Sequence, residues 1–244
     1  MKRLLPLFLL SVISGCIPFP GYSNYESNTL DANYFFAVDV NGDESDIALY
    51  ISDGTSAGTI MLKSGFSSLP FGNSRAMSDG YIEFTDDTVF FNGCDEINGC
   101  ELWKSDGTPE GTVLVKDIFP GGWDSDPKYI TEMGNAVYFA ADNGSNGNEL
   151  WKSDGTETGT FLLKDIFTST IGTKYSWPRN LTRGGNILYF TANSATDVNK
   201  LWKSDGTEAG TVMVQGIADD GGTIANHFIE MDNMVYFQAS NNSN

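Results

Sequence analysis

Apolar and aromatic residues recur along this chain in short runs, which glycine, asparagine and aspartate separate. Each unit of the pattern holds an aromatic pair, a polar loop, a Leu-Trp or Leu-Tyr pair before Ser-Asp-Gly-Thr, and an apolar run after a second Gly-Thr. Short apolar runs bounded by turn residues are typical of β-strands, and no stretch after the N-terminus has the 3.6-residue period of an amphipathic helix. The pattern therefore predicts an all-β chain.

The pattern occurs four times, and its best-preserved part reads Leu-Trp-Lys-Ser-Asp-Gly-Thr. The copies cover residues 48–55, 101–108, 149–156 and 200–207, with aromatic pairs upstream at 35–36, 90–91, 138–139 and 189–190 and a fifth pair at 236–237. The first copy departs from the others at Ala48, Tyr50 and Ile51, and the fourth has Lys200 where the second and third have glutamate. A role that requires four equivalent copies is therefore not expected.

Each copy accommodates four short antiparallel strands, with the aromatic pair in the second, Leu-Trp in the third, and the second Gly-Thr opening the fourth. Four such strands in a repeat of about fifty residues are typical of one β-propeller blade. We expect blades over residues 29–66, 80–119, 128–167 and 179–218, and the first hairpin of a fifth over 226–244. An open β array or a stacked solenoid is the alternative. The incomplete fifth repeat suits either a fragment of a larger ring or a ring closed against the first blade.

The repeated segments resemble the bacterial ELWxxDGT repeat family, a group of secreted or surface proteins, over residues 33 to 239. The resemblance implies a propeller-like architecture and a location outside the cytoplasm. It implies little about activity.

The N-terminus predicts export. Met1-Lys2-Arg3 precedes an apolar run over residues 4–13 that is too short to span a bilayer, as in a signal peptide over residues 1–15. The segment Ile13-Ser14-Gly15-Cys16 resembles the bacterial lipobox, which implies a lipidated Cys16, a tether over residues 16–28, a repeat domain over 29–244, and anchoring at the outer membrane or cell surface. An ordinary signal peptide with a chance cysteine is the alternative.

Charge and cysteine content reduce the number of functions that the sequence supports. The chain has 32 acidic and 14 basic residues and a formal net charge of −18, which disfavours binding to nucleic acid. Cys94 and Cys100 lie close together in an exported chain, so we expect a disulfide. These cysteines and the single histidine, His227, do not form a zinc-ligand set.

The Asp-Gly-Thr segment is the first candidate for chemistry. A carboxylate at this place accepts hydrogen bonds from turn amides, and the following glycine supplies a positive φ. The arrangement is similar to the Asp-box hairpin of sialidase-like propellers, where it is structural. We expect a structural role, with calcium or sugar contact as the alternative, for Asp53, Asp106, Asp154 and Asp205.

The tryptophans fall into two groups. Trp103, Trp151 and Trp202 recur with the repeat, which predicts packing between neighbouring blades more than stacking on sugar. Trp123 and Trp177 lie in connections outside the repeat, so they are the better candidates for ligand contact.

A calcium site is a further hypothesis. Asp39, Asn41 and Asp43 place oxygen ligands at alternate positions, as calcium loops do, although ordinary turn chemistry explains the same residues. No other cofactor is indicated.

Sequence motifs for catalysis are weak. His227 occupies a strand position held elsewhere by tyrosine or asparagine, and no nucleophile elbow or phosphate loop is present. We therefore expect a non-catalytic, lipid-anchored envelope module for binding or adhesion, with a polysaccharide or a surface protein as its ligand. The alternatives are an extracellular carbohydrate hydrolase that uses carboxylates at the propeller centre, and a purely structural envelope protein.

Overall fold

The computed structural model describes residues 34–42, 46–70, 82–85, 87–168, 175–214 and 224–240, and all regular structure in them is β. The strands are β1 (Tyr34–Asp39), β2 (Ile47–Ser52), β3 (Ile60–Ser68), β4 (Ile82–Phe84), β5 (Val89–Asp95), β6 (Gly99–Ser105), β7 (Val113–Lys116), β8 (Lys128–Met133), β9 (Ala136–Asp142), β10 (Asn148–Ser153), β11 (Phe161–Lys164), β12 (Arg179–Gly184), β13 (Ile187–Ala192), β14 (Lys200–Ser204), β15 (Val212–Met213), β16 (Ile224–Met231) and β17 (Met234–Ser240). The all-β prediction is confirmed. Within the described ranges, no helix has the length and apolar character needed to cross a bilayer.

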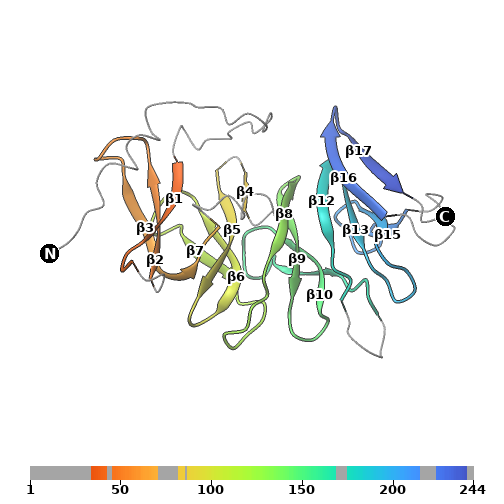
Figure 1. Cartoon of the computed structure of the whole chain (residues 1–244), viewed down its shortest axis with the longest axis horizontal. Helices are drawn as coiled ribbons and strands as arrows, with labels where there is room; N and C mark the ends of the chain where they lie inside the picture. Colours follow the sequence, from red (N-terminus) through yellow and green to blue (C-terminus); the bar gives the residue numbers. More distant parts are fainter. Residues whose placement is uncertain are drawn as a thin grey trace.

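The third and fourth repeats form the predicted units. Strands β8 to β11 make one four-stranded sheet, and β12 to β15 make another. Within each, strands that are consecutive in sequence pair antiparallel. Strands β16 and β17 form a separate hairpin, and the sheets follow one another along the length of the molecule (Figure 1).

The first two repeats depart from separate four-stranded sheets. Strand β3 pairs with β5 through Phe66 and Ser68, so that β1 to β7 form one seven-stranded sheet. Phe66 is fully buried and packs edge-on against Phe91 and Trp103 of the second repeat. Burial of this ring holds the end of β3 beside β5, which a strand-by-strand interpretation of the sequence does not predict.

Three hydrophobic clusters fill the spaces between consecutive repeats. The first lies between the first and second repeats, the second between the second and third, and the third between the third and fourth. In the second and third motifs the leucine and the tryptophan enter different clusters: Leu150 packs against the fourth repeat, whereas Trp151 packs against the second. Because adjacent strand residues point to opposite sheet faces, one Leu-Trp pair packs its sheet against both neighbouring sheets.

Lysines add polar contacts between the same repeats. Lys116 Nζ donates to Thr160 O (2.7 Å), and Lys152 Nζ donates to Gly206 O (3.2 Å). In both cases a lysine of one repeat contacts the Asp-Gly-Thr loop of the next. The repeated motif therefore encodes the docking of sheets as well as the folding of each one.

The first strands of successive repeats, β4, β8, β12 and β16, lie side by side (Figure 1). The last three carry register shifts, with Tyr129, Asn180 and His227 at φ values of 57°, 56° and 53°. A positive φ at one residue of a β-bulge redirects the side chains on either side of it. His227 therefore occupies the recurring bulge of these strands.

Candidate functional site

The Asp-Gly-Thr aspartates are engaged by their own turns. Asp106 Oδ1 accepts hydrogen bonds from the backbone N–H (2.9 Å) and the hydroxyl (2.7 Å) of Thr108. The bond from the threonine hydroxyl is the main reason that the pKa of Asp106 is lowered. The same two bonds, at 2.7 to 2.9 Å, and a lowered pKa recur at Asp53, Asp154 and Asp205.

The second glycine of each motif gives this carboxylate its space. A Cβ at Gly111 would lie 2.0 Å from Asp106 Oδ1, and one at Gly159 would lie 1.9 Å from Asp154 Oδ1. Neither glycine is among those with a positive φ, so the requirement at these positions is steric. These geometric facts assign the recurring Asp and Gly to the turn.

Two glutamates of the motif are fully buried. Glu101 accepts hydrogen bonds from Ile118 N (3.0 Å), Phe119 N (3.1 Å) and Ser125 Oγ (2.5 Å). Glu149 accepts from Ile166 N (2.8 Å) and Ser176 N (3.1 Å). Each carboxyl thus fixes the connection from its own repeat to the next.

Sequence reasoning missed this role of the glutamates. Its signal was present, because Glu101 and Glu149 share one offset from the Asp-Gly-Thr turn and precede an Ile and a Ser in the following connection. Burial raises the pKa of both carboxyls to about 7, against the hydrogen bonds, which lower it. They are structural acids inside the protein rather than groups facing a substrate.

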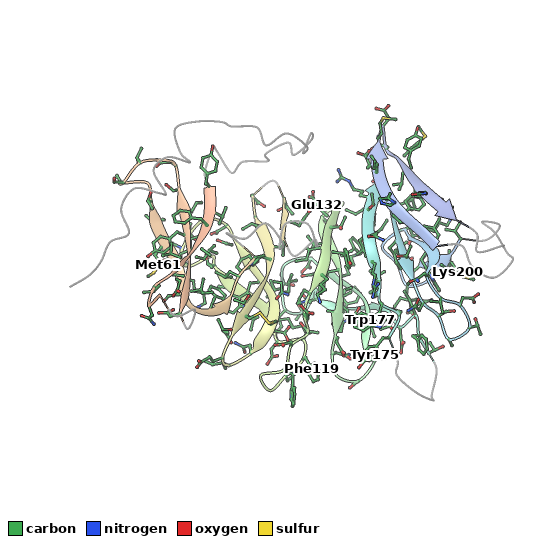
Figure 2. The ribbon with its side chains drawn as sticks, in the orientation of Figure 1. Met61, Phe119, Glu132, Tyr175, Trp177 and Lys200 are labelled. Atoms are coloured by element: carbon green, nitrogen blue, oxygen red, sulfur yellow. A yellow bond between two sulfur atoms is a disulfide. The ribbon has the colours of Figure 1, made fainter. Side chains whose placement is uncertain are left out.

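The recurring tryptophans are also internal. Trp103, Trp151 and Trp202 are buried members of the clusters between repeats. By contrast, Trp123 is 63% exposed and Trp177 is 42% exposed. Trp123 stacks on Phe119 with ring centroids 6.0 Å apart, while Trp177 lies beside Tyr175 (5.2 Å) at the ends of the sheets (Figure 2).

The other predicted sites fall partly outside the described residues. Cys16 and Asp43 both lie there, so lipidation and the complete calcium loop stay predictions. Asp39 Oδ1 accepts a hydrogen bond from Gly42 N (2.8 Å), as in an ordinary turn. The described part of the chain holds no cluster of three or more His, Cys, Asp or Glu side chains that could ligate a metal.

The two cysteines face each other across a hairpin. Cys94 on β5 and Cys100 on β6 are partners in the strand register and are joined by a disulfide.

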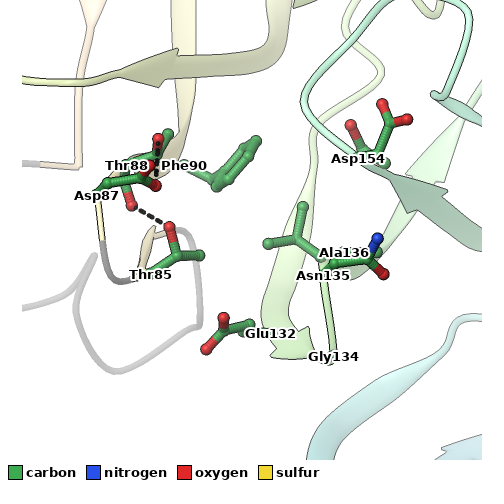
Figure 3. Close-up of a pocket in the computed structure, with 11 residues that line it drawn as sticks. Thr85, Asp87, Thr88, Phe90, Glu132, Gly134, Asn135, Ala136 and Asp154 are labelled. Carbon is green, nitrogen blue, oxygen red and sulfur yellow. Dashed lines mark hydrogen bonds between the residues drawn. The ribbon is translucent and has the colours of Figure 1, made fainter.

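An acidic pocket of about 420 Å³ lies between the second and third repeats. Residues from the β4–β5 turn, including Asp87, face those of the β8–β9 turn, with Asp154 and Glu132 at the rim (Figure 3). Glu83, whose pKa is raised to about 7 mainly by burial, accepts a hydrogen bond from Glu132 N (3.0 Å) but does not line the pocket. The two glutamates therefore do not flank this cleft as a hydrolytic pair.

A second pocket, of about 220 Å³, lies between the third and fourth repeats. Its lining combines two cations, two aromatic rings and one amide: Lys128, Arg179, Tyr129, Trp177 and Asn148, together with Ala140 and Pro178. The guanidinium carbon of Arg179 lies 5.8 Å from the centre of the Trp177 ring. The sequence-predicted candidate Trp177 thus lies in a pocket, whereas Trp123 is not among the residues that line either pocket.

Comparison with known proteins gives no family assignment. No family profile matches the sequence, and no curated protein matches it. Among solved structures, TolB from Acinetobacter baumannii superposes with a TM-score of 0.41 at 15% identity over 75% of this chain. Puromycin hydrolase superposes with a TM-score of 0.44 at 14% identity over 85% of this chain. Prolyl oligopeptidase B from Galerina marginata superposes with a TM-score of 0.46 at 12% identity over 86% of this chain.

This chain corresponds to 40% of the TolB chain, 32% of the hydrolase and 29% of the oligopeptidase. At these TM-scores the strand pairing of the chain itself, and not the superpositions, defines its fold.

Proposed function

We propose that this protein is an exported, lipid-anchored propeller module of the ELWxxDGT type that binds a ligand at the cell surface without transforming it. The observation that best supports a binding function is the contrast between residues that recur in the repeats and residues that do not. The repeated Asp, Glu and Trp side chains are engaged in turns, connections and packing. The unrepeated Trp177 instead lies half-exposed in a pocket with Arg179.

The connection holds Trp177 in an unusual backbone conformation. Its φ is +48°, a region that bulky residues rarely adopt and that costs about 1–3 kcal/mol. Backbone N–H groups of Ser176 and Trp177 both donate to Asn148 O, at 3.1 and 3.2 Å, which holds the strained residue in place. Asp126 has a φ of +50° in the preceding repeat, so this backbone conformation belongs to the repeat, and the exposed ring is what distinguishes Trp177.

Binding can be tested on a glycan array with the full chain carrying Cys16→Ala, which keeps it free of lipid. We expect at least one surface polysaccharide to bind, with a loss of tenfold or more in Trp177→Ala. Trp123→Ala is the matched control, because it removes the other exposed tryptophan from a connection. Binding that survives Trp177→Ala, or an array without any ligand, would contradict the proposal.

The anchor is tested separately by cell fractionation in a Gram-negative host. The wild-type chain is expected in the membrane pellet with incorporated radioactive palmitate. Cys16→Ala is expected in the soluble periplasmic fraction. A wild-type chain that is soluble and unlabelled would remove the lipoprotein assignment and leave an ordinary signal peptide.

A further inference from the structure

The pocket beside Trp177 has a filled counterpart one repeat earlier. There, Asn92 Nδ2 donates to Asp126 Oδ1 (3.1 Å), and Asp126 Oδ2 forms an ion pair with Lys128. Asn92 pairs with Leu102 of the motif, and Asp126 N donates to Cys100 O (3.0 Å). A neutralised polar network therefore occupies this place between the second and third repeats.

The equivalent positions in the next repeat carry different side chains. Ala140 pairs with Leu150 as Asn92 pairs with Leu102, and Trp177 N donates to Asn148 O as Asp126 N donates to Cys100 O. Ala140 and Trp177 therefore replace the amide and the carboxylate of the earlier network. The position of Lys128 is taken by Arg179. The 220 Å³ pocket lies where the first network is missing.

The same replacements change the charge of the site. The lining contains Arg179 and Lys128, of which Lys128 is ion-paired with Asp126, and no carboxylate. Among the described residues no Asp or Glu forms an ion pair with Arg179, whose guanidinium lies over the Trp177 ring. In a chain of net charge −18 this guanidinium is a local positive charge, which favours an anionic group.

The side chains that line the pocket indicate which class of ligand it can bind. A guanidinium held over a ring presents a planar fork of donors, which matches the two oxygens of a carboxylate. Tyr129 and Trp177 supply apolar ring surface, and Asn148 supplies an amide. A volume of 220 Å³ is below the roughly 300–1,000 Å³ of pockets for drug-sized ligands, so the occupant is about one ring in size.

We propose that this pocket binds the carboxylate-bearing ring of a hexuronic acid unit in an acidic polysaccharide. Arg179 receives the carboxylate, and Trp177 with Tyr129 contacts the ring. This inference rests on the binding function proposed above and names the ligand class of the same site.

The test uses the full chain with Cys16→Ala and titrates it with glucuronic acid, galacturonic acid, glucose, galactose and the dipeptide Ala-Ala by NMR. We expect a uronic acid to bind at least tenfold more tightly than the neutral sugars. Arg179→Gln should remove that difference, and raised salt should reduce it. Arg183→Gln, on the same strand but paired with Glu132 (3.9 Å), is the matched control and should leave it unchanged.

A second variant refills the pocket with the side chains of the earlier repeat. Ala140→Asn combined with Trp177→Asp should abolish uronic acid binding while the melting temperature stays the same or rises, because Asp126 already occupies the equivalent positive φ of 50°. Full binding by this double variant would overturn the proposal.

The remaining outcomes separate this inference from the binding function. Equal affinity for neutral and acidic sugars, or no effect of Arg179→Gln, overturns carboxylate recognition but leaves a sugar-binding module. Tighter binding of Ala-Ala than of any sugar replaces the polysaccharide by a peptide ligand. If no probe binds, the uronic acid proposal fails, and the array with Trp177→Ala decides the binding function independently.

Discussion

The recurring aspartate and the glycine five positions later act as one steric unit. The Asp154 carboxylate accepts two hydrogen bonds from Thr156 and occupies the space in which a Cβ of Gly159 would lie. The turn therefore needs both residues, because a larger side chain would displace the carboxylate from its donors.

Gly159→Ala should reduce the free energy of unfolding by about 1–3 kcal/mol, as overpacking does. Urea denaturation measures the change. Asp154→Ala removes the carboxylate with which the new methyl group would clash. The double variant Asp154→Ala with Gly159→Ala should therefore lose less stability than the sum of the losses in the two single variants. Strict additivity would show that the clash with the carboxylate is not the cause.

At the scale of strands and connections, the buried glutamates join a central strand to the segment that leads into the next repeat. Glu149 on β10 binds the N–H groups of Ile166 and Ser176, which lie on either side of that connection. The first and fourth motifs have Ala48 and Lys200 at this position, so this clamp belongs to the two middle copies.

Glu149→Ala should cost about 1–3 kcal/mol, because it leaves the buried N–H group of Ile166 without an acceptor, while Ser176 N keeps its bond to Asn148 O. Hydrogen exchange should show lost protection at the amide of Ile166, and a smaller loss at Ser176, which still donates to Asn148 O. Glu157→Ala is the control, since Glu157 is exposed in the neighbouring loop, and it should change stability by less than about 0.5 kcal/mol. Unchanged exchange at Ile166 in Glu149→Ala would contradict the clamp.

At the scale of the molecule, two sets of carboxyls give stability opposite pH dependences. Burial raises the pKa values of Glu83, Glu101 and Glu149 to about 7 from 4.5. Between pH 4.5 and 7 the folded state therefore binds more protons than the unfolded state, and stability falls as pH rises. The turn aspartates have pKa values below 3.8, so their contribution is lost as pH falls through that region.

The melting temperature should therefore be highest near pH 4 to 5 and decrease towards pH 7. A scan from pH 3 to 8 in 0.5 M salt checks this, since the salt screens repulsion among the exposed acids. The double variant Glu101→Gln with Glu149→Gln should show a smaller decrease in melting temperature above pH 4.5. Its loss of stability below pH 4 should be the same as in the wild-type chain. An equally steep decrease in this double variant would assign it to other groups.

Much of the local structure was predictable from the sequence. The aromatic pairs at residues 138–139 and 189–190 lie in the second strands of their repeats, β9 and β13, as predicted, and each Asp-Gly-Thr lies in the turn after a third strand. The exposure of the outer strands was not predictable from the pattern: Phe161 lies in the apolar run of β11 and is 45% exposed. An apolar run reports strand formation, but not whether another sheet covers it.

The sequence by itself determined the all-β class, the repeat and its turns, because side-chain alternation and turn chemistry act between residues close along the chain. The tertiary structure decided the rest. It joined β3 to β5 through Phe66, buried Glu101 and Glu149 against distant amides, and left a pocket at Ala140, Trp177 and Arg179. Each of these depends on which residues meet across sheets, and a repeat pattern shows equivalent positions without showing what fills the space between them.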